Sequence, residues 1–152
     1  MKAFCIVLFA LGVAVGLGCV NGRDCTLVGC EQGVEIDFRT PYSEAGTYTI
    51  TVDVDGARTT CTVVLPMTPM TGKPCDQDSV GVRYALSEAG AEKVIASVGL
   101  TTTNAKSITV DVAKDGTELA HATFAPTYTT SAGPNGSSCD PQSCTFAQKD
   151  FP

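Results

Sequence analysis

The sequence lacks most of the residues on which catalytic and metal sites are built. It contains no tryptophan and a single histidine, His121, so it has no histidine pair at zinc-binding spacing. A Gly-x-Ser-x-Gly nucleophile elbow and a complete EF-hand loop are also missing. We therefore predict that the protein is not an enzyme, that it needs no cofactor or metal, and that His121 is an ordinary surface or edge residue.

Basic residues are few. The chain has 10 lysines and arginines against 16 acidic residues, which gives a formal net charge of −6. A negative domain repels the phosphates of nucleic acids and is not attracted to anionic membranes. We therefore predict that the partner is not a nucleic acid.

One long uncharged run is present, and it lies at the start of the chain. Met1-Lys2 is followed by an uncharged segment from Ala3 to Val20. A run of this size is at the lower limit for a membrane span, but its position and its small C-terminal residues are typical of a secretory signal. The sequence therefore predicts export, with residues 1–18 as the signal peptide.

The end of that run indicates how the protein is held. The residues Gly16-Leu17-Gly18-Cys19 resemble the lipobox of bacterial lipoproteins. That resemblance implies a lipid on Cys19, and Val20 after it resembles outer-membrane sorting. Membrane contact would then run through the lipid. Cleavage after Gly22, which gives a freely secreted protein, and a retained anchor remain alternatives, so the predicted location is the outer membrane or the extracellular space.

The cysteines support export. Eight are present, of which Cys5 leaves with the signal peptide and Cys19 carries the lipid. An oxidising compartment favours pairing of the others. We expect Cys61 and Cys75 to close a loop around Pro66, and the two ends of the chain to be joined by the remaining four cysteines in either order: Cys25 and Cys30 with Cys139 and Cys144.

The mature part is dominated by strands of period two. Tyr48, Ile50, Val52 and Val54 alternate with threonine and aspartate, and similar alternation recurs along the chain. We predict seven strands, over residues 33–39, 46–54, 57–65, 79–86, 93–100, 106–113 and 117–125. Even spacing of this kind favours an all-β, immunoglobulin-like antiparallel β-sandwich, with a small up-and-down barrel as the alternative.

These strands place the domain boundaries. Residues 19–32 form a tether with the N-terminal cysteine pair, residues 33–130 the sandwich, and residues 131–152 a disulfide-stapled tail rich in proline, glycine and serine.

Asp55-Gly56 and Asp115-Gly116 predict hairpin turns. They follow two copies of the sequence Ile-Thr-Val-Asp-Val, so we expect both turns at one pole, on a shared acidic surface. A further hypothesis is ligand binding by the threonine row from Thr47 to Thr51, with Thr60 and Thr62 opposite it. Another is calcium held by aspartates at or near turns and loops, namely Asp53, Asp55, Asp76, Asp78, Asp111 and Asp115.

Three features together resemble a group of uncharacterised predicted lipoproteins of myxobacteria. They are the Cys25–Cys30 pair after a signal, the strand-Asp-Gly-strand unit with Thr60-Cys61-Thr62-Val63, and the ending from Tyr128 through Pro134-Asn135-Gly136 to Cys144. The resemblance implies export and a β-fold, and it implies no activity.

Two functions follow as hypotheses. The first is a non-catalytic module, envelope-anchored or secreted, with a binding or structural role toward an unknown protein or glycan. The second is a secreted hydrolase inhibitor that presents the disulfide-braced loop from Pro66 to Cys75.

Overall fold

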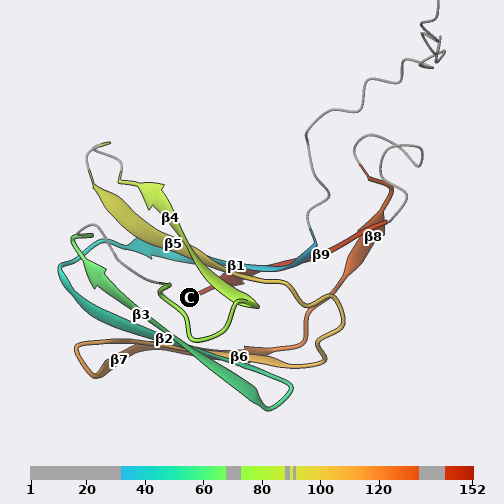
Figure 1. Ribbon diagram of the computed structural model, residues 1–152, viewed down its shortest axis with the longest axis horizontal. Coiled ribbons are helices and arrows are strands. Elements are labelled where there is room, and N and C mark those ends of the chain that lie inside the picture. The colour runs from blue at the N-terminus through green and yellow to red at the C-terminus, as the bar shows by residue number, and fades with distance from the viewer. Residues whose placement is uncertain (1–31, 68–72, 88–89, 91, 134–142) are drawn as a thin grey trace, which may run out of the picture.

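The computed structural model describes residues 32–67, 73–87, 90, 92–133 and 143–152 (Figure 1). Within these ranges the chain forms strands and no helix, so no helix there is long and apolar enough to cross a membrane. The strands are β1 (Gly33–Tyr42), β2 (Gly46–Val54), β3 (Ala57–Leu65), β4 (Val80–Leu86), β5 (Lys93–Leu100), β6 (Ile108–Lys114), β7 (Thr117–Phe124), β8 (Thr129–Ser131) and β9 (Cys144–Phe151).

The strands form two sheets that lie face to face. The five-stranded sheet has the order β4-β5-β1-β9-β8, and the four-stranded sheet has the order β3-β2-β6-β7. Figure 1 shows them as an upper and a lower layer. Neither sheet closes on itself, so the predicted sandwich is confirmed and the barrel alternative is wrong.

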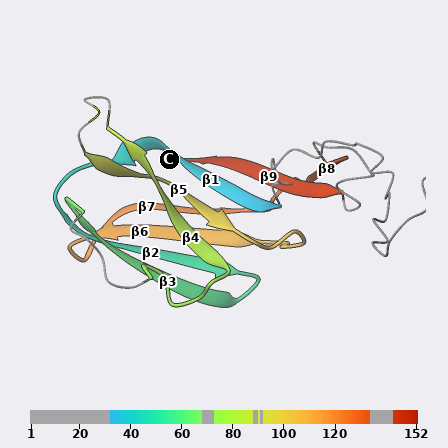
Figure 2. The same ribbon diagram turned by 45° about the horizontal axis from the view of Figure 1, so that its top comes forward.

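The strand orders are those of an immunoglobulin-like sandwich. With β1, β5 and β4 in the places of strands B, E and D, the other sheet follows as C′, C, F and G in β3, β2, β6 and β7. One pairing departs from the antiparallel pattern. β9 occupies the place of strand A beside β1 but comes from the C-terminal end and runs parallel to β1 (Figure 2).

The core lies between the sheets and is made by the inward-facing residue of each alternation. Ile36, Ile50 and Val52 are completely buried, as are their cross-strand neighbours Val98 and Val110. Each such side chain contributes roughly 1.5–3 kcal/mol on burial. The apolar residues of the period-two pattern are therefore the residues that hold the two sheets together.

The C-terminal strand is part of this core. Phe151 is 1% exposed, and its ring packs edge-on against Phe38 with ring centroids 5.6 Å apart. The last strand predicted from the sequence ends at Ala125, and residues 131–152 were predicted to form a tail. Strands β8 and β9 were therefore not predicted. The alternation of β9 is hidden in the sequence because Lys149 lies on its inward side, where the amine lies over the Phe124 ring.

The two Asp-Gly turns lie at opposite ends of the sandwich. β2 and β6 are antiparallel neighbours, with Tyr48 opposite Lys114 and Val54 opposite Ile108. The turn after Val54 therefore lies at the end where β6 begins, and the turn after Lys114 lies where β2 begins. The predicted shared pole is wrong, because antiparallel pairing of the two repeated sequences separates their turns.

Both turns nevertheless use aspartate in the same way. Asp55 and Asp115 adopt a left-handed backbone with φ of 52°. The carboxylate of Asp55 accepts hydrogen bonds from the backbone N–H groups of Lys106 and Ser107, and that of Asp115 accepts one from Thr47. Each turn is thus fixed to the start of the neighbouring strand.

The predicted disulfide between Cys61 and Cys75 is present. It joins β3 to the segment before β4, and Cys61 is completely buried. Cys144 is also disulfide-bonded. The other predicted cysteines, namely Cys19, Cys25, Cys30 and Cys139, lie outside the described residues.

Candidate functional site

The single histidine lies on the outer face of the four-stranded sheet. His121 on β7 is directly opposite Asp111 on β6 and hydrogen-bonds to it through Nδ1. This hydrogen bond, together with the negative charge of Asp111, raises the pKa of His121 above its usual value of 6.5. The register continues the same row with Thr51 and Thr60. No cysteine or serine nucleophile belongs to this row.

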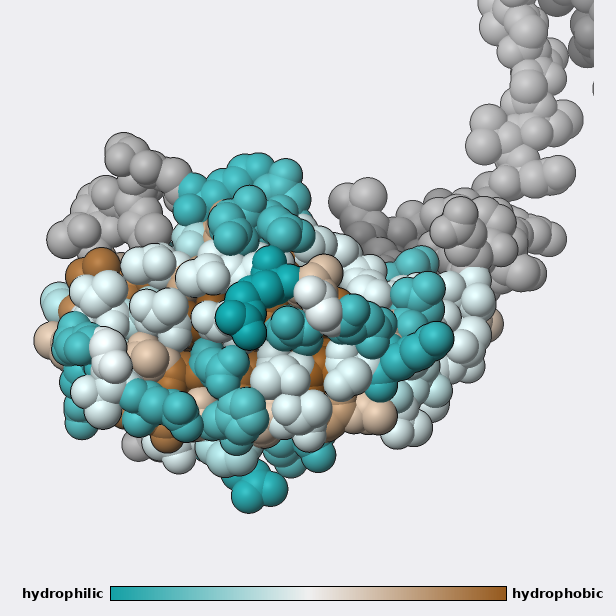
Figure 3. Space-filling view, turned by 90° about the horizontal axis from the view of Figure 1, so that it is seen from below, coloured by the Kyte–Doolittle hydropathy of each residue, from teal (hydrophilic) through white to brown (hydrophobic). Residues whose placement is uncertain are grey.

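Threonines cover much of the rest of this face. Their predicted cross-strand register is confirmed in two pairs, Thr49 opposite Thr62 and Thr51 opposite Thr60. Thr109 and Thr123 form a further pair, with hydroxyl oxygens 2.8 Å apart. Figure 3 looks onto this side and shows weakly polar and charged residues with small apolar areas between them. Threonine is β-branched and polar, so it favours the strand conformation on a face that is exposed to solvent.

The acidic residues considered for calcium have protein partners. Asp53 accepts a hydrogen bond from the backbone of Gly56, Asp76 accepts one from Thr60, and Asp78 pairs with Lys73. Among the described residues, no group of three or more histidine, cysteine, aspartate or glutamate side chains is arranged to hold a metal.

A different arrangement occupies the outer face of the five-stranded sheet. Glu35 points outward from β1, between the buried Val34 and Ile36, yet its side chain is only 15% exposed. It is covered by Arg83 of β4, whose Nε lies 2.9 Å from one carboxylate oxygen. The buried Ser97 of β5 donates its hydroxyl to the other oxygen. Glu35 is therefore held in place from two neighbouring strands.

Two glycines make room for this ion pair. Gly99 on β5 lies opposite both Glu35 on β1 and Gly81 on β4. A Cβ at Gly99 would lie 3.0 Å from Nε of Arg83 and 3.2 Å from Oε2 of Glu35, whereas a Cβ at Gly81 would meet nothing within 4 Å. Neither glycine has the positive φ that would require glycine. The sheet is thus left bare at Gly81, whereas at Gly99 the ion pair fills the space that a side chain would take.

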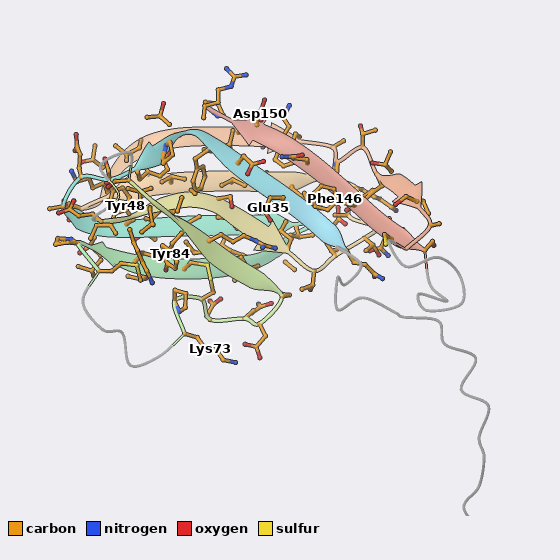
Figure 4. All side chains as sticks on the ribbon, turned by 90° about the horizontal axis from the view of Figure 1, so that it is seen from above. Glu35, Tyr48, Lys73, Tyr84, Phe146 and Asp150 are labelled. Carbon is orange, nitrogen blue, oxygen red and sulfur yellow. A yellow bond between two sulfur atoms is a disulfide. The ribbon has the colours of Figure 1, made fainter. Side chains whose placement is uncertain are left out.

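Beside these glycines the surface is hollowed. The hollow has a volume of about 330 Å³, and we call it the Glu35 hollow. Its polar and aromatic lining residues are Gln32, Glu35, Arg83, Phe146 and Gln148. Figure 4 looks onto this face and labels Glu35 on β1 and Phe146 on β9. Gln148 also donates its amide to Asp37 at 2.7 Å, which fixes its orientation.

The carboxylates at and beside the Glu35 hollow are held by groups of the protein itself. Glu35 forms an ion pair with Arg83 and accepts a hydrogen bond from Ser97, and Asp37 accepts one from Gln148. The arrangement therefore offers polar groups whose orientation is fixed.

Sequence analysis missed this site. The lining residues come from β1 and the residue before it, and from β4, β5 and β9, and the Asp37–Gln148 contact joins positions 111 residues apart. The available signal was Gly81 and Gly99 within strand patterns, because glycine inside a strand often marks close approach by a ligand.

Comparison with known proteins adds no assignment. The chain matches no protein-family model, no curated protein and no solved structure. The function must therefore be argued from the site.

Proposed function

We propose that the protein is an exported, non-catalytic binding module, lipid-anchored at Cys19 or released, that recognises its partner through the Glu35 hollow. The observation that carries this proposal is the bare position at Gly81, next to Gly99, which makes room for a fixed ion pair. Glycine in a strand interior costs about 0.5–1 kcal/mol relative to alanine. Within the described part of the chain, no atom lies within 4 Å of the place that a Cβ at Gly81 would take.

The remainder of the site supports binding without chemistry. Functional pockets combine a concave surface with a few fixed polar groups. Arg83 and Gln148 supply such groups, and both are tied to carboxylates on β1. Groups that are already oriented lose less conformational entropy when a ligand binds.

Ligand capture by matched variants tests the proposal. The exported chain is applied to arrays of immobilised glycans and of peptides as wild type, Arg83→Ala and Arg58→Ala. Arg58 is a matched arginine with an exposed side chain on the other sheet. We expect at least one ligand to be retained by wild type and Arg58→Ala and lost by Arg83→Ala. If no ligand distinguishes the two variants, the hollow is not the recognition surface.

The anchor is tested separately. Mass spectrometry of membrane-extracted protein is expected to find an acylated Cys19 at the N-terminus. An unmodified N-terminus at Arg23 would instead establish the freely secreted form, and it would leave the binding proposal in place.

The hydrolase-inhibitor alternative has one supporting observation. The Cys61–Cys75 disulfide braces the base of the loop, and backbone hydrogen bonds from Thr62 to Pro74 and from Asp76 to Thr60 reinforce it. A panel of proteases and glycosidases separates the two functions. Inhibition that is weakened by Lys73→Ala and unaffected by Arg83→Ala would favour the inhibitor.

A further inference from the structure

The charges in the Glu35 hollow cancel. Arg83 and Glu35 are both lining residues and form an ion pair with each other. Asp37 and Asp150 are neighbours on the same outward face, so an anionic ligand would meet additional negative charge. The hollow therefore offers no uncompensated positive charge, and its own carboxylate is already neutralised.

The remaining hydrogen-bonding groups suit hydroxyls. Gln32 and Gln148 carry primary amides, and each amide presents both donors and an acceptor. Arg83 uses Nε for Glu35 and has further N–H donors on a side chain that is 65% exposed. Hydroxyl groups donate and accept in turn, so they match this mixed set better than a purely acidic or basic ligand does.

An aromatic ring completes the lining. Phe146 is half-buried on β9, directly beside Gly33, which has no side chain to cover it. Its ring belongs to the wall of the hollow. An aromatic surface next to polar groups binds ligands that carry C–H faces and hydroxyls on the same ring.

A row of outward positions extends this surface across the sheet. Gly81, Gly99, Glu35 and Gln148 are opposite one another on four adjacent strands. At a strand spacing of about 4.8 Å the row is roughly 14 Å long, which is longer than a single sugar ring. Gly81 is bare at one end of the row, and the Arg83–Glu35 ion pair lies over Gly99 in its middle.

The geometry points to an uncharged oligosaccharide as the ligand of the Glu35 hollow, an inference that rests on the proposed binding function. Phe146 stacks on one sugar ring, while Gln148, Gln32 and the outer N–H groups of Arg83 bind hydroxyls. The adjoining units of the ligand lie over the Arg83 side chain and extend toward Gly81.

Titration of the ¹⁵N-labelled exported chain tests the ligand class. The probes are short soluble oligomers of neutral sugars, of β-1,4-, β-1,3- and α-1,4-glucan and of xylan, together with an anionic galacturonan oligomer and a cationic chitosan oligomer. We expect a neutral oligomer to shift the backbone amides of Gly33, Gly99 and Gln148. The charged oligomers should leave these amides unmoved.

Variants relate the shifts to the proposed contacts. Gln148→Ala should weaken binding about tenfold, which corresponds to roughly 1.4 kcal/mol, whereas Gln77→Ala, on the loop before β4, should not. Phe146→Leu keeps the apolar packing but removes the ring and should weaken binding, while Phe146→Tyr should retain it. Thermal unfolding of each variant separates loss of binding from loss of fold.

Three other outcomes would overturn all or part of this inference. A charged oligomer or an array peptide that binds at these amides, in place of neutral sugars, overturns the ligand class and preserves the binding module. Neutral sugars that bind with equal affinity to wild type and Arg83→Ala overturn both the ligand class and the site. The absence of shifts with every neutral oligomer overturns the inference.

Discussion

The outer faces of the two sheets carry different residues at their outward positions. On the four-stranded sheet the outward positions opposite each other are filled by threonine pairs and by the Asp111–His121 pair. On the five-stranded sheet two opposed positions are glycine, and a partly covered ion pair lies beside them. β-Branched residues favour strands and glycine disfavours them. The first face therefore favours stability, whereas the second gives up stability to create a concave surface.

The ends of the four-stranded sheet provide the largest expected effect. Asp55→Ala removes the acceptor for the backbone N–H groups of Lys106 and Ser107 and leaves alanine at a φ of 52°. We expect a loss of about 2 kcal/mol in the free energy of unfolding. Chemical denaturation measures it.

Asp55→Asn is the matched control, because Asn-Gly also forms this turn. It should cost less than half as much as Asp55→Ala. Ligand capture by the folded variants should be unchanged, since the turn belongs to the other sheet. A loss of capture without a loss of fold would contradict the assignment of binding to the five-stranded face.

The glycine under the ion pair is expected to have the next largest effect. Gly99→Val places side-chain atoms where Arg83 and Glu35 now lie. Displacement of the arginine leaves a mostly covered carboxylate with one partner fewer. We expect a destabilisation of about 1–2 kcal/mol, measured by chemical denaturation.

Introducing threonine on the five-stranded face and glycine on the four-stranded face should change the free energy of unfolding by smaller amounts, with opposite signs. At Gly81→Thr the new Cβ has no described residue within 4 Å, and threonine favours strands. It should raise the free energy of unfolding by about 1 kcal/mol and weaken ligand binding. Thr51→Gly should lower stability by a similar amount and leave binding unchanged. If Gly81→Thr binds as well as wild type, the bare position has no role in recognition.

The smallest effect is the pH dependence of the Asp111–His121 pair. The pKa of His121 is raised in the folded state by Asp111. The stabilisation is therefore fully present below the unfolded value of 6.5 and is lost as the pH rises through the folded pKa. NMR titration should find this pKa above 6.5, and Asp111→Asn should lower it. Because the side chain of His121 is exposed, the change in unfolding free energy should be small and weakened by salt. A pKa that does not respond to Asp111→Asn would contradict the contact.

The sequence was most informative where the signal is local. The predicted bounds 46–54, 57–65 and 93–100 coincide with β2, β3 and β5. The pairing of β6 with β7 shifts register at Leu119, where the alternation of the sequence also changes phase. Side-chain alternation and Asp-Gly turns act within a few residues, so they can be recognised without knowledge of the partner strands.

The candidate site could not be predicted because it is formed by residues that lie far apart in the sequence. Glu35 belongs to the strand predicted over residues 33–39, but nothing near it in the sequence indicates that Arg83 and Gln148 are its neighbours. Phe146 and Lys149 obscured the alternation of β9, and the parallel pairing of that strand with β1 has no local signature. The two turns were placed together because their sequences repeat, although antiparallel pairing separates them.

By itself, then, the sequence determined that the segments of β1 to β7 become strands and which face of them is buried, and it favoured the pairing of Cys61 with Cys75. These properties depend on side-chain period, turn chemistry and the small number of cysteines left to pair. Only the tertiary structure decided that β1 lies between β5 and β9, which brings Glu35, Arg83, Phe146 and Gln148 onto one surface. Pairing between distant strands is selected by burial of the whole core, and a binding surface on the outside of a sheet is a consequence of that selection.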